Sequence, residues 1–159
     1  MSENNAVEPI TAPTSLLDED LSAVDTSMPV IRGPVTIELE IVDVTEEESK
    51  DKTGMNLVIK VKTVTPVNST KGDIISPGFP MKKWIGLTPM VGRPGKKDYD
   101  GEMIKKSLAQ FQEAVEGKKS SIKPLERFKG QRVMAKIGVQ EATEKYPNES
   151  NSIQFVKRG

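Results

Sequence analysis

Alternating apolar and polar residues predict that the folded part of the chain begins with a long strand. Apolar side chains occupy every second position from Val35 to Ile41, which is the period of a strand with one buried face. The apolar positions then shift by one residue, to Val42 and Val44. Because such a shift turns the buried face over, we expect a bulge or a sharp coil there.

Four further segments have the periodicity of strands, and stretches rich in charged residues, glycine or proline separate them. These strands are expected at residues 55–62, 79–88, 132–139 and 153–156. In the second of the four, the alternation assigns Lys83 and Ile85 to the core face. Lys82 and Trp84 then lie on the opposite face.

One segment, about Gly101 to Glu116, predicts a helix. Asp100 is a suitable N-cap, and Gly117 is a suitable C-terminal stop. The apolar stripe along this segment consists of Ile104, Leu108, Phe111 and Val115. We expect this stripe to pack on the sheet.

The predicted order of elements is three strands, one helix and two strands. This is the order of an oligonucleotide/oligosaccharide-binding (OB) barrel, in which the helix between the third and fourth strands closes one end of the barrel. A long first strand that bends also fits such a barrel. We therefore expect residues 33–159 to form a mostly β, five-stranded, OB-fold-like domain (β-β-β-α-β-β). A β-sandwich with one inserted helix and a jelly roll are the competing folds.

The N-terminal residues predict a disordered acidic tail, which we place at residues 1–32. Residues 1–30 contain six acidic residues and no Lys or Arg, whereas the rest of the chain holds all 23 basic residues and 17 acidic ones. A segment this polar buries too little apolar surface to offset the conformational entropy that it would lose on folding. The asymmetry indicates a polyanionic partner or a tail that masks the domain, while a merely solubilising tail remains the simpler alternative.

The residue inventory argues against an enzyme. The chain has no cysteine and no histidine. The familiar catalytic pairs of a nucleophile and a base therefore cannot form, and most transition-metal sites lack their usual ligands. Gly92–Lys97 superficially resembles a phosphate-binding loop, but its spacing is wrong. We predict no catalytic residue, no metal site and no cofactor. No apolar run approaches the length of a membrane span and no signal-peptide pattern is present, so a cytoplasmic location is expected.

The candidate site combines the single tryptophan with cations. Trp84 and Lys82 share the outer face of their strand, and Lys60 and Lys62 point outward from the preceding strand. A groove of this kind holds phosphates by charge and stacks bases on an aromatic ring. The following loop extends it with Arg93, Lys96, Lys97 and Tyr99. The alternatives are that Trp84 covers a second small core and that the loop cations are merely solvated.

The overall pattern resembles the phage single-stranded DNA-binding families that are built on this barrel. Four stretches carry the resemblance. They are the acidic lead-in Leu17–Leu21 that continues to Asp25, the strand Ile37–Ile41, the glycine turn before Leu57–Lys60, and the ending Tyr146–Asn148 with Ile153–Val156. The familiar members carry their acidic tail at the C-terminus, whereas here it is N-terminal.

The resemblance implies a protein that binds single-stranded DNA with little sequence preference during phage DNA replication or recombination, in the host cytoplasm. Its acidic tail would contact replication or recombination proteins, and the oligomeric state, including a homo-oligomer, stays open. The alternative is a virion structural protein, a capsid or tail component, whose N-terminal arm becomes ordered on assembly.

Overall fold

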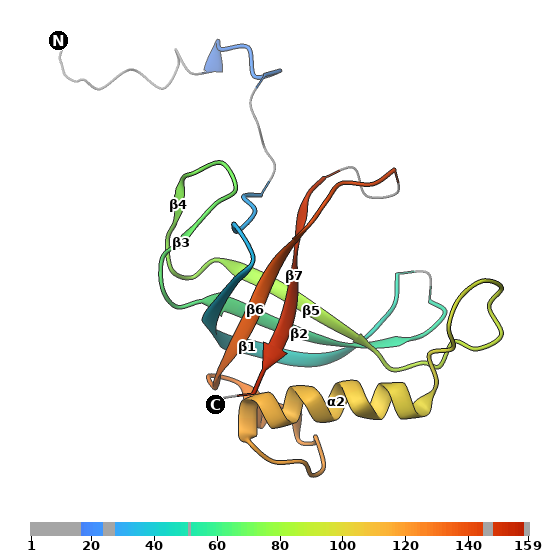
Figure 1. Cartoon of the computed structure of the whole chain (residues 1–159). Coiled ribbons are helices and arrows are strands. Elements are labelled where there is room, and N and C mark those ends of the chain that lie inside the picture. The colour runs from blue at the N-terminus through green and yellow to red at the C-terminus, as the bar shows by residue number, and fades with distance from the viewer. Residues whose placement is uncertain (1–16, 24–27, 51, 145–147, 158–159) are drawn as a thin grey trace.

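The computed structural model describes residues 17–23, 28–50, 52–144 and 148–157, which form a curved sheet with one long helix (Figure 1). The elements are β1 (Val35–Glu48), β2 (Met55–Thr63), β3 (Val67–Asn68), β4 (Ile74–Ile75), β5 (Pro80–Gly86), α2 (Gly101–Glu116), the 3-10 helix η1 (Leu125–Phe128), β6 (Arg132–Gln140) and β7 (Ser150–Val156). The predicted order of long elements is therefore confirmed. The short β3–β4 hairpin lies in a segment that was predicted to be a loop.

The main sheet is antiparallel and has the strand order β5-β2-β1-β6-β7. Strand β1 is long enough to pair with β6 through its first half and with β2 through its second half. The pairing with β2 shifts between Ile41 and Asp43, and Val42 is 47% exposed at this point. The predicted bulge is thus confirmed, and it lets one strand serve two differently oriented parts of the sheet.

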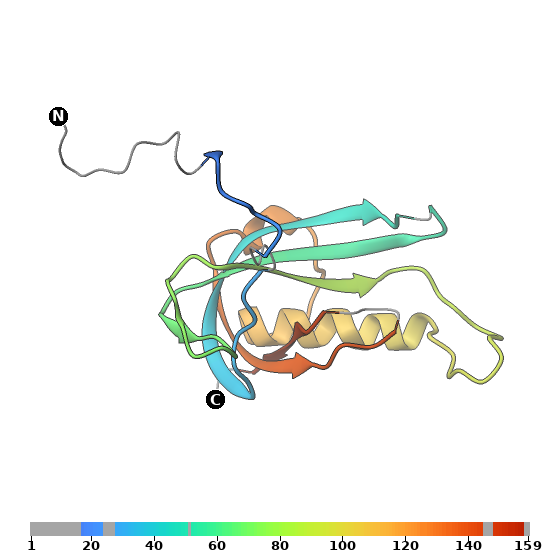
Figure 2. The ribbon, with the colours of Figure 1, turned by 90° about the horizontal axis from the view of Figure 1, so that it is seen from above.

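The sheet does not close into the predicted barrel. Within the described residues, the edge strands β5 and β7 share no ladder of backbone hydrogen bonds. Helix α2 instead packs against β5, β6 and β7 (Figures 1 and 2). The ring of its buried Phe111 packs at a tilt against Phe128 and against Phe155 of β7, with ring centroids 4.9 and 5.3 Å apart. Helix α2 thus contacts both edge strands of the sheet.

The caps of α2 agree with the sequence prediction. The Asp100 carboxylate accepts a hydrogen bond from the Met103 N–H at 3.0 Å. Gly117 adopts the left-handed conformation, with φ 75°, and its N–H binds the Glu113 carbonyl. Ile104 and Phe111 of the predicted stripe are buried, so the helix is held both by its ends and by its apolar face.

Packing begins before β1, at Ile31. This residue is fully buried, and its N–H donates to Asn151 Oδ1 at 2.8 Å. The Thr70 N–H also donates to the Val30 carbonyl at 2.8 Å. The core therefore includes a residue that precedes the predicted start at Gly33.

Most of the predicted acidic tail lies outside the described residues. Leu17 and Leu21, which are described, are 82% and 67% exposed. In the described part of the chain, no helix is both long and apolar enough to cross a membrane.

Candidate nucleic-acid interface

Trp84 lies on the outer face of the edge strand β5, as the alternation predicted. Its side chain is 58% exposed, whereas the next residue, Ile85, is 6% exposed on the core side. Trp84 stands opposite Val58 of β2. Although Val58 also faces outward, it is only 2% exposed, because it lies between Trp84 and Thr45 in the register of the three strands. The indole is therefore not enclosed in a second core.

The lysines of β2 are paired with carboxylates of β1. Lys60 Nζ lies 4.0 Å from Glu47 Oε2, and Lys62 Nζ lies 3.6 Å from a Glu40 oxygen. These two predicted site residues thus face a strand of opposite charge, which weakens their attraction for phosphate. Lys82, opposite Lys60 in the register, is exposed and has no ion-pair partner among the described residues.

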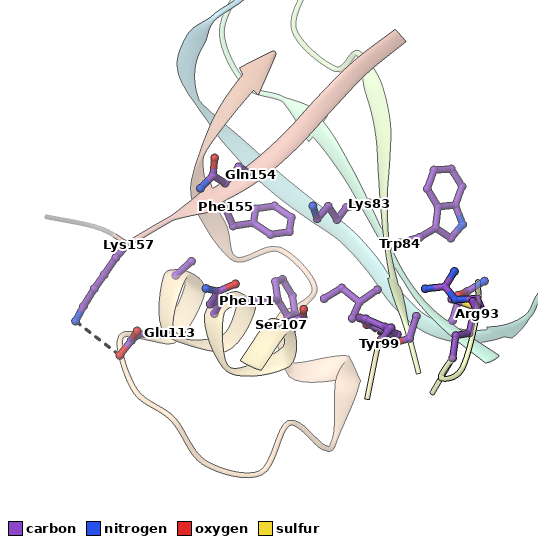
Figure 3. A pocket seen from close by; sticks show the side chains of 16 residues that line it. Lys83, Trp84, Arg93, Tyr99, Ser107, Phe111, Glu113, Gln154, Phe155 and Lys157 are labelled. Carbon is purple, nitrogen blue, oxygen red and sulfur yellow. Dashed lines mark hydrogen bonds and ion pairs between the residues drawn. The ribbon is translucent and has the colours of Figure 1, made fainter. Parts of the chain in front are cut away.

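A cleft of about 680 Å³ opens between β5, β7, helix α2 and the loop that follows β5 (Figure 3). Three of the predicted site residues line it: Trp84, Arg93 and Tyr99. Further lining residues, which sequence reasoning did not assign to a site, include Lys83, Ser107, Phe111, Gln154, Phe155 and Lys157. Lys96 and Lys97 do not line the cleft and are exposed on the same loop.

The loop between β5 and α2 is anchored by Tyr99. The Tyr99 hydroxyl donates to the Gly86 carbonyl at 2.6 Å, and the backbones of Tyr99 and Met90 exchange two hydrogen bonds of 2.8 Å. A Cβ on residue 86 would lie 3.3 Å from the Tyr99 ring. Glycine at this position therefore lets the ring lie close against the end of β5.

Arg93 sits at the end of the cleft nearer Trp84 (Figure 3). Its Nη2 donates to the Lys97 carbonyl at 3.1 Å. Its Nε is buried and has no hydrogen-bond partner among the described residues. Among the described residues, the five N–H donors of this guanidinium therefore have one protein acceptor, the Lys97 carbonyl.

Lys83 points to the opposite side of β5 from Trp84, toward Phe155 (Figure 3). Its ammonium donates to the Ile153 carbonyl of β7 at 2.7 Å and so bridges the two edge strands. Burial lowers the pKa of this lysine from its ordinary value. The sequence signal was present, because a lysine alternating with Met81 and Ile85 occupies a core position.

Aromatic rings form one wall of the cleft. Phe155 is partly buried and packs on Phe111 of α2. At the far end, Lys157 lies 3.7 Å from Glu113. The site thus combines aromatic surface, two half-buried cations and an exposed indole at the rim.

Comparison with known proteins adds no family to this description. No protein-family model matches the chain, and a search of curated proteins finds no significant match. The chemistry of the outer face of β5 and of the adjoining cleft is therefore the basis for a proposed function.

Proposed function

We propose that this protein binds single-stranded DNA with low sequence specificity, in the replication or recombination of phage DNA, and acts as a binding protein rather than an enzyme. One observation carries the proposal. Trp84, the single tryptophan, is 58% exposed on an edge strand beside cations. A tryptophan is usually substantially buried. An exposed indole among cations is the arrangement that stacks unpaired bases while phosphates are held by charge.

The topology supports the same proposal. We infer that the sheet is a partly open OB barrel, with β1, β2, β5, β6 and β7 as its five strands. In such barrels the second and third strands carry the ligand face. Those strands correspond here to β2 and β5, and Trp84 and Lys82 both lie on β5.

The charges that serve this role are concentrated near β5 rather than on β2. Lys82, Lys96 and Lys97 are exposed, whereas Lys60 and Lys62 are paired with glutamates. The strand would therefore lie along β5 and its following loop, with an electrostatic contribution that falls as salt rises.

The direct test is fluorescence anisotropy with a labelled oligo-dT and with a labelled duplex of equal length. The single strand should bind more tightly, and log K against log salt should slope by about −0.7 per phosphate neutralised. The double variant Lys96→Gln/Lys97→Gln should reduce that slope. Lys118→Gln/Lys119→Gln, which removes the same charge at the other end of α2, is the matched control. Preference for the duplex, or a salt-independent affinity, contradicts the proposal.

One observation favours the second candidate, a virion structural component. The exposed Leu17 and Leu21 are apolar side chains in an acidic arm, and an arm of this kind can pack on a neighbouring subunit. Sedimentation velocity separates the two functions. The structural role is favoured if the protein forms ordered assemblies that dissociate when both leucines are changed to serine, and if it has no affinity for oligo-dT.

A further inference from the structure

We infer that one nucleotide of the bound strand leaves the outer face of β5 and inserts its base into the cleft between β5 and β7. This inference rests on the proposed single-strand binding and specifies how the site would work. The strand would pass over Trp84, turn around the end of β5 at Gly86, and place a base against Phe155 and Tyr99. The cleft volume of about 680 Å³ lies within the range of about 300–1,000 Å³ found for small-molecule sites.

The polar groups of the cleft call for a ligand with hydrogen-bond acceptors. Arg93 lines the cleft, and among the described residues its five N–H donors have one protein acceptor, the Lys97 carbonyl. Lys83 uses one N–H on the Ile153 carbonyl, and an ammonium has three. A nucleotide supplies the matching oxygens. Its phosphate suits the guanidinium at the Trp84 end of the cleft, and a base carbonyl suits the lysine near Phe155.

The walls are held in place before any ligand arrives. Phe155 is packed against Phe111 of α2, and Tyr99 is fixed by its hydrogen bond to the Gly86 carbonyl. Rings that are already ordered lose little conformational freedom when a base stacks on them. The β5–β7 gap that leaves the sheet open is thus the feature that admits the base.

The desolvation of the Lys83 ammonium supports a role in ligand binding. A half-buried ammonium is disfavoured by desolvation, and its hydrogen bond to the Ile153 carbonyl only partly replaces water. A methionine at this core position would avoid that cost. The other N–H groups of the Lys83 ammonium can serve an acceptor-rich ligand in the cleft.

Photo-crosslinking of the full chain tests the inference. The probe is an oligo-dT in which 5-iodouracil replaces each thymine in turn, and the crosslinked residues are located by mass spectrometry. Crosslinks to Phe155 or Tyr99, in addition to Trp84, are expected. Crosslinks to Trp84 alone, at full affinity, overturn base insertion and leave single-strand binding intact. No affinity for the oligomer overturns both.

A matched pair of loop variants provides the second test. Arg93→Gln removes the cation that lines the cleft, whereas Lys96→Gln removes one that lies outside it on the same loop. Arg93→Gln should weaken oligo-dT binding about tenfold, the effect of losing one hydrogen bond to a charged group, and should abolish the crosslinks to Phe155 and Tyr99. Lys96→Gln should leave those crosslinks unchanged. Equal effects of the two variants on affinity and crosslinks, with unchanged thermal unfolding, contradict the inference.

Discussion

Replacement of Trp84 by alanine should affect binding strongly and stability only moderately. The side chain is 58% exposed, so of its roughly 250 Å² about 100 Å² is covered by the protein. At about 25 cal/mol per Å², the covered area corresponds to at most about 2.5 kcal/mol. Alanine keeps part of that contact, so we expect a loss of about 1–2 kcal/mol on unfolding in urea. A tryptophan in a core would cost about 3–5 kcal/mol.

The loss in binding follows from stacking. Base stacking on an aromatic side chain contributes about 1–3 kcal/mol, which corresponds to a fall of about 5- to 150-fold in affinity for oligo-dT. Anisotropy of a labelled oligomer measures this directly, without the tryptophan signal.

Ile74→Ala is the control for that measurement. Ile74 is 72% exposed on β4, and it does not line the β5–β7 cleft. This variant should therefore bind as the parent protein does. The reasoning is refuted if Trp84→Ala loses 3 kcal/mol or more of stability, or if it binds oligo-dT as tightly as Ile74→Ala.

Three further outcomes are expected. Arg127 donates hydrogen bonds of 2.9 and 3.0 Å to the Glu116 carboxylate and holds the pKa of Glu116 below its ordinary value. The pair therefore stabilises the fold at pH values above the pKa that Glu116 has in the unfolded chain. This stabilisation is lost as the pH falls through the pKa that Glu116 has in the folded protein. Glu116→Gln should therefore cost about 1–3 kcal/mol in urea unfolding at neutral pH, and a cost unchanged at acidic pH would contradict this assignment. Deletion of residues 1–27 removes six carboxylates and should raise affinity for oligo-dT, most at low salt; unchanged affinity excludes masking by the tail. Lys82→Gln should weaken oligo-dT binding more than Lys62→Gln does, because the charge of Lys62 is already paired with Glu40. Equal losses of affinity, measured by anisotropy, would show that the ion pair does not matter.

The elements that the sequence predicted well are those determined by local patterns. The shift of apolar positions at Val42 marks the bulge in β1, because one residue inserted in an alternating strand must turn its face. Asp100 and Gly117 bound α2 because capping depends on the residues at the helix ends themselves. The outward position of Trp84 follows from period two along a single strand.

The features that the sequence did not predict depend on contacts between distant segments. The ion pair of Lys62 arises because the register of β1 against β2 places Glu40 opposite it, and Lys60 reaches Glu47 farther along the same strand β1. Alternation within β2 carries no information about that register.

The open edge has a similar origin. Phe155 and Phe111 meet only once α2 has packed across the end of the sheet. Strand periodicity indicates neither that meeting nor the cleft beside it. Lys83 was assigned to the core face, but its role as a bridge to Ile153 required the two edges to be seen together.

The most direct test of single-strand binding through β5 uses the emission of the single tryptophan. The free protein should emit at long wavelength, because Trp84 is 58% exposed. Addition of oligo-dT should quench this emission to saturation, while a duplex of equal length should quench it far less at the same concentration. A short-wavelength emission that oligo-dT leaves unchanged would contradict the account.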